Sequence, residues 1–147
     1  MAGRLHILDL LRLLRDAKAI LERASDLLTL PDLSDPEAVY AWCRKVVAVA
    51  NSLAVITPNT YDDKVVIFLN THVFSSYEAF KPWYDVFRVI ISLLHSEDDD
   101  AIVADKALYY ANESVRDELA AVEAGVDPVT ILSVVVTLIR LIVRVLK

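Results

Sequence analysis

The stretch of the sequence best suited to chemistry is a polar run at 95–100, which reads His-Ser-Glu-Asp-Asp-Asp. Carboxylate oxygens are the ligands that hard divalent ions prefer, so an ion at 97–100 is one interpretation. The residues that follow, AIVADKA, lack both the ligand spacing and the glycine of an EF-hand loop. His95 and Glu97 alone supply too few ligands for a transition-metal site. We therefore favour a solvated acidic loop that leads into a helix.

The other reactive side chains lack the partners that catalysis requires. Cys43 is the single cysteine and stands in an apolar row with no histidine near it, which is typical of a buried, inert thiol. The histidines, His6, His72 and His95, are far apart, and neither the Glu-x-x-His nor the HExxH pattern occurs. We therefore expect no enzymatic activity, no catalytic residue, no metal site and no cofactor.

Composition limits the fold and the partners. The chain has 147 residues, the length of one ordinary domain, and 56% of them are hydrophobic. Only two glycines are present, which excludes Gly-rich phosphate loops and disfavours a hairpin-rich β fold. The net charge of −6 argues against nucleic acid as a partner. No small-molecule substrate is indicated.

Apolar periodicity and breaker residues predict an all-α bundle of five or six helices in a single domain, 1–147. The expected breaks lie near Pro31, Pro58, 70–75, 96–100 and Gly125. The expected helices are 4–28, 36–56, 60–70, 75–95, 101–124 and 128–147. The run KVVIFLN at 64–70 also has strand composition, but we expect a short helix because a lone strand would have no partner. Pro82 either kinks its helix or restarts it.

The last expected helix, 128–147, carries the strongest physical signal. Its polar residues recur at steps of three and four, so they form one narrow stripe on an otherwise apolar helix. Such a helix requires burial on most sides, in the core of the chain, in an oligomer interface or in a membrane. The candidate interface residues are Ile131, Val134, Val135, Leu138, Leu141, Ile142 and Val145.

Charge is distributed unevenly around this helix. The segment 97–127 has ten acids against two bases, whereas the residues after Asp127 include three bases and no acid. A hairpin at Gly125 would bring Arg144 or Lys147 within salt-bridge reach of Asp105 or of 98–100. The charge-pairing candidates are Asp105, Arg140, Arg144 and Lys147.

A short segment at 57–66, TPNTYDDKVV, has the pattern of a helix start, with Asp62 and Asp63 placed to cap it. This segment resembles helix starts in small, uncharacterised phage-encoded helical proteins. The resemblance implies a phage structural or accessory component and carries no site residues.

Three hypotheses for the function follow. The first is a non-enzymatic, self-assembling structural protein that forms homo-oligomers and acts inside the cell or in a virion. The second is a membrane-associated protein anchored through 128–147, although a mid-membrane Arg140 would cost about 2.5 kcal/mol or more. The third is a helical small-ligand-binding domain or enzyme with an aromatic-lined pocket. The apolar surface of the last helix favours the first.

Overall fold

The computed structural model describes residues 25–56 and 60–146, and every regular element in these ranges is helical. The predicted all-α fold is therefore confirmed. The longer α-helices are α2 (Pro36–Ile56), α3 (Thr60–Phe68), α5 (Tyr84–Ser92), α6 (Asp100–Leu108), α7 (Glu113–Ala120) and α8 (Pro128–Leu146). The short elements are η1 (Ser25–Leu28), the π-helical turn η2 (Leu69–Val73), α4 (Tyr77–Phe80) and η3 (Lys81–Trp83).

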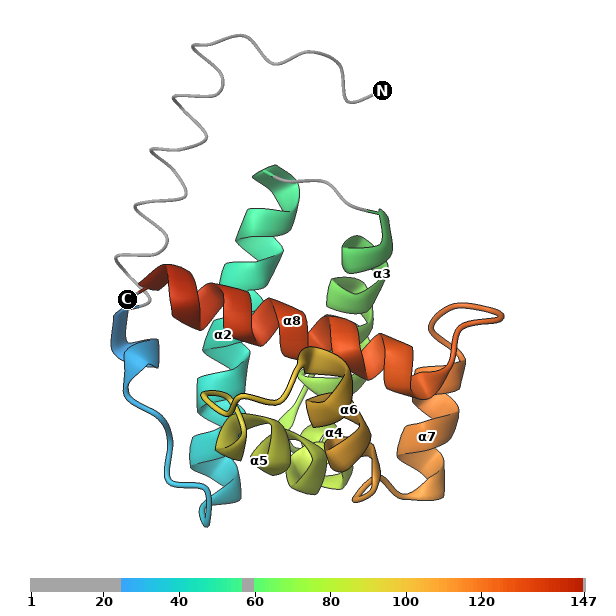
Figure 1. Cartoon of the computed structure of the whole chain (residues 1–147), viewed down its shortest axis with the longest axis horizontal. Coiled ribbons are helices and arrows are strands. Elements are labelled where there is room, and N and C mark those ends of the chain that lie inside the picture. The colour runs from blue at the N-terminus through green and yellow to red at the C-terminus, as the bar shows by residue number, and fades with distance from the viewer. Residues whose placement is uncertain (1–24, 57–59, 147) are drawn as a thin grey trace, which may run out of the picture.

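Helix α8 runs across the molecule and packs against several other helices. Figure 1 shows it crossing α2 and α3, with α5 and α6 on one side and α7 near its N-terminal end. The most extensive packing joins α8 to α6, and α6 also packs on α5. In the part of the chain described here, no helix combines the length and hydropathy that crossing a bilayer requires.

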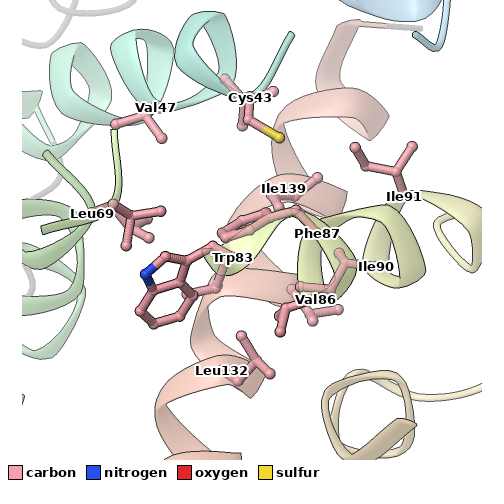
Figure 2. Packing of buried hydrophobic residues seen from close by; sticks show 14 of the residues in the cluster. Cys43, Val47, Leu69, Trp83, Val86, Phe87, Ile90, Ile91, Leu132 and Ile139 are labelled. Carbon is pink, nitrogen blue, oxygen red and sulfur yellow. The ribbon is translucent and has the colours of Figure 1, made fainter. Parts of the chain in front are cut away.

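The hydrophobic core lies where α2, α5 and α8 meet. Figure 2 shows Cys43 of α2, Phe87 of α5 and Ile139 of α8 directed toward the same interior space. A void of only about 10 Å³ lies among these side chains, so the core is close-packed. Phe80 extends the core with aromatic contacts, its ring centroid lying 5.4 Å from that of Tyr40 and 5.5 Å from that of Phe74.

Two hydrogen bonds anchor the segment that precedes α2. The Trp42 indole N–H donates to the Leu27 carbonyl over 3.2 Å, and the Tyr84 hydroxyl donates to the Leu33 carbonyl. Leu27 itself is fully buried. Most of the expected helix 4–28 lies outside the described residues, and its described end forms the 3-10 turn η1.

The chain between 60 and 95 is helical but interrupted. The run 64–70 is not a strand: it continues α3 into the π-helical turn η2, where the Phe74 amide donates to the Leu69 carbonyl over 2.8 Å. Pro82 lies in the 3-10 turn η3, after which α5 begins. Proline therefore restarts the helix here, since its ring prevents an uninterrupted α-helical ladder.

The prediction of a single helix over 101–124 is wrong. The structure has two helices, α6 and α7, separated at 109–112. The Asn112 side chain accepts a hydrogen bond of 2.9 Å from the Val115 amide and so acts as the N-cap of α7. Apolar residues keep helical spacing through this break, which is why periodicity alone joined the two helices.

Gly125 adopts a left-handed backbone between α7 and α8, with φ of +80°. A Cβ at this position would meet nothing within 4 Å, so the cost of a side chain is conformational rather than steric crowding. We expect Gly125→Ala to destabilise the fold by about 1 kcal/mol, and Gly125→Asn by less, because asparagine tolerates this conformation better. Urea unfolding measures both. Equal stability of wild type and Gly125→Ala would contradict a structural need for this turn.

Cys43 is buried, and desolvation strongly raises the pKa of its thiol. We expect native protein to react with a thiol reagent at least about 10³-fold more slowly than unfolded protein. Exposure of Cys43 should require global unfolding, against a stability of about 5 kcal/mol or more. Alkylation followed by mass spectrometry, with and without denaturant, measures the ratio. Similar rates in the two conditions would contradict this burial.

Candidate functional site

Helix α8 presents its polar stripe on one side and its apolar face to the core. The exposed or partly exposed members of the stripe are Thr130, Ser133, Thr137, Arg140 and Arg144. The buried residues are Ile131, Leu132, Val135, Val136, Ile139, Ile142 and Val143. The predicted orientation of the stripe therefore agrees with the structure over 130–144.

The candidate interface residues of α8 fall into different environments. Ile131, Val135 and Ile142 are buried in the core of their own chain, where a partner does not reach them. Val134 and Leu138 are half-buried against that core, and Leu141 is exposed. The side chain of Val145 lies outside the described residues. A role at an interface stays a prediction for Val134, Leu138 and Leu141.

Arg140 organises the loop between α5 and α6. Its side chain is only 12% exposed, and its Nη1 donates to the Asp98 carbonyl at 2.7 Å and to Asp100 Oδ1 at 2.9 Å. Its Nη2 donates to the Leu93 carbonyl at 2.9 Å and to Ser96 Oγ at 3.3 Å. The Leu93 carbonyl, which follows α5, therefore accepts from Arg140 in addition to the Ser96 amide, which lies 3.0 Å away.

Each aspartate of the acidic run has a structural partner. Asp98 accepts from Lys106 Nζ at 2.6 Å, and Asp99 caps α6 by accepting from the Ile102 amide at 2.9 Å. Asp100 pairs with Arg140, and its Oδ2 also lies 2.6 Å from the hydroxyl oxygen of Thr137. The three carboxylates therefore serve the loop and the start of α6.

The predicted charge pairing occurs one turn earlier on α8 than expected. Arg140, and not Arg144, reaches the acidic run, and Arg144 makes no ion pair with the described residues. Asp105 likewise has no ion-pair partner among them, and Lys147 is outside them. The break at 109–112 and the turn before α8 shift α6 along α8 relative to a continuous hairpin.

The contacts of Arg140 and the acidic run form a network that stabilises the fold. Its carboxylates and guanidinium are committed to one another and to backbone groups. Over residues 25–56 and 60–146, no group of three or more His, Cys, Asp or Glu is placed to hold a metal ion. The network is best described as a clamp that holds the α5–α6 loop on α8.

Comparison of the chain with protein family models, curated proteins and solved structures finds no significant match. A function for this protein therefore rests on the chemistry of its own side chains.

Arg140 was among the charge-pairing candidates, but most of its acceptors could not be predicted. Arg140 is a charged residue in the middle of an apolar helix, and such a residue usually needs a nearby acid and further acceptors. The acidic run supplies the carboxylate, but backbone carbonyls at 93 and 98 supply most of the rest. Carbonyl partners depend on the local path of the loop, which the sequence pattern does not specify.

Replacing Arg140 should destabilise the protein substantially. In Arg140→Gln, the charge on Asp100 loses its cationic partner, and the Leu93 and Asp98 carbonyls lose the hydrogen bonds that the guanidinium donates. We expect a loss of about 3 kcal/mol in the free energy of unfolding, as when one partner of a mostly buried ion pair is removed. Denaturant unfolding of wild type and variant measures the loss.

Arg144→Gln is the matched control for this prediction. It removes the same charge from the same helix, but from an exposed side chain, so the expected change is within about 0.5 kcal/mol. Equal losses in the two variants would show that the Arg140 contacts contribute nothing specific.

Proposed function

We propose that this protein is a non-enzymatic helical structural protein that assembles with further copies of itself. The observation that carries the proposal is an exposed aromatic surface where α6 ends. Tyr109 is 79% exposed and Tyr110 is 51% exposed, and their rings meet edge to face with centroids 5.3 Å apart. Tyrosine supplies large contact area at low entropic cost, and it is enriched in the residues that dominate binding energy.

The surface around these tyrosines is hollowed. The hollow has a volume of about 650 Å³ and lies between α5 and the α6–α7 segment. The guanidinium carbon of Arg88 lies 5.9 Å from the centre of the Tyr110 ring, within the range of a cation–π contact. Half-buried Leu93 and Leu108 supply apolar surface in the same hollow. An aromatic centre with a charged rim is the usual anatomy of a protein–protein interface.

The charges of the rim support a second copy of the chain as the partner. Arg116 donates to the Leu108 and Ala111 carbonyls but has no carboxylate partner in the described part of the chain. Asp105, on the same rim, has no cation there either. A two-fold arrangement would place Arg116 of each copy near Asp105 of the other, with the tyrosines between them. Such an arrangement would give both unpaired charges a partner in the second copy.

The resemblance of 57–66 to helix starts in small phage-encoded helical proteins supports a more specific setting. In this proposal the protein is a phage structural or accessory component that acts inside the cell or in the virion. Self-association is the property such a component needs, and it does not depend on any catalytic group.

The test is the molar mass of the native protein as a function of concentration. We expect light scattering after size exclusion to report an oligomer at micromolar concentration, and Tyr109→Ser with Tyr110→Ser to return it to monomer. Loss of two central aromatic residues typically costs several kcal/mol of binding, or more than about 100-fold in affinity.

Ile67→Ser provides the control, because Ile67 is 62% exposed and does not line the tyrosine hollow. We expect it to leave the molar mass unchanged. A wild-type protein that stays monomeric up to about 100 μM would refute the proposal, since contacts that weak are unsuited to a stable assembly.

A further inference from the structure

A second hollow lies on the other side of the Arg140 clamp. It is formed by the residues that follow α5 and by the C-terminal half of α8, and its volume is about 370 Å³. The described residues that line it are Leu94, His95, Ser96, Arg140, Val143 and Arg144. Its volume lies in the range typical of small-ligand sites.

The polar groups that line this hollow are donors. Arg144 and the His95 ring are exposed and make no hydrogen bond to the described residues. The Ser96 hydroxyl accepts from Arg140, which leaves its own proton available to a further acceptor. Among the described residues, the lining contains no carboxylate, although the chain as a whole carries a net charge of −6.

Among the described residues, no carboxylate forms an ion pair with Arg144. Of the nearby acids, Asp98 pairs with Lys106 and Asp100 pairs with Arg140, while Asp99 caps α6 and Glu97 is exposed outside the lining. Two arginines four residues apart on one helix repel each other. In the described part of the chain, Arg140 has a carboxylate partner and Arg144 has none.

Arg140 lines the same hollow, but its donors are not available to a ligand there. Its Nη1 and Nη2 donors are used by Asp100, Ser96 and backbone carbonyls, and its Nε is buried.

We propose that this hollow binds an oxyanion of the phosphate class. Arg144, the His95 ring and the Ser96 hydroxyl would donate to its oxygens. Arginine suits this role because its planar guanidinium can donate two parallel hydrogen bonds to one oxyanion. Soluble phosphate compounds and lipid headgroups present the same oxygens, and the experiments below distinguish between them.

The first experiment measures binding of inorganic phosphate to the full-length protein. Calorimetry and the thermal midpoint are followed against phosphate, with sodium chloride at matched ionic strength as the reference. We expect saturable binding and a phosphate-dependent rise in the midpoint, because a ligand that binds only the folded state stabilises it. Arg144→Gln should weaken phosphate binding about tenfold. Absence of saturable binding to both phosphate and the vesicles described below would overturn the proposal.

The matched control is Arg44→Gln, which removes an equal charge from an exposed residue of α2 outside the hollow. It should leave phosphate affinity unchanged, and equal losses in the two variants would overturn the site by showing a general charge effect. Flotation with phosphatidylcholine vesicles, with and without phosphatidic acid, distinguishes the source of the phosphate. Arg144-dependent flotation only with phosphatidic acid assigns a lipid headgroup, whereas binding of free phosphate without flotation assigns a soluble ligand.

Discussion

The contact on which the rest of the structure depends is the one between Arg140 and the loop that joins α5 to α6. A guanidinium that is nearly buried must be surrounded by acceptors, because an unpaired charge in a protein interior is strongly unfavourable. Here one carboxylate, two backbone carbonyls and one hydroxyl provide them. The loop is held in one conformation as a result, and α6 begins at a defined point on α8.

This clamp also explains how such an apolar helix is accommodated. Most of the valine, leucine and isoleucine face of α8 is covered by α2, α3 and α6 of the same chain. If apolar residues surrounded α8 on all sides, the polar side chains of its stripe would be buried without hydrogen-bond partners. Placing Thr137 and Arg140 against Asp100 gives the stripe a polar partner without exposing the core. Less of the apolar surface of α8 is therefore left for a partner to bury than the composition of the helix suggests.

The features that the sequence predicts are those set by residues close together along the chain. The all-α fold, the separation of buried and polar faces on α8 and the turn at Gly125 follow from periodicity and local backbone preference, and the structure agrees with all three. The break before Asn112 was missed because apolar spacing continues through it, and a capping side chain looks the same as a surface one in sequence. The acidic loop was expected, and Arg140 was among the charge-pairing candidates, but the pair with this loop was assigned to Arg144 or Lys147. Which arginine meets Asp100 depends on where α6 lies along α8, a non-local quantity that the missed break alters.

The same loop separates the two proposed binding surfaces and contacts both. Lys106 lines the tyrosine hollow and binds Asp98, while Arg140 lines the second hollow and binds the carbonyl of that same aspartate. Proximity of this kind does not by itself establish coupling, which requires an element with two arrangements that both sites favour differently. Every aspartate of the loop is already hydrogen-bonded in the arrangement described, so a second arrangement would have to break several of these contacts together. The clamp keeps the loop in one conformation. We therefore expect the tyrosine hollow and the second hollow to bind their ligands independently. Any coupling that did occur would be reciprocal, so that an anion bound at Arg144 and a partner bound at the tyrosines would change each other's affinity by the same factor.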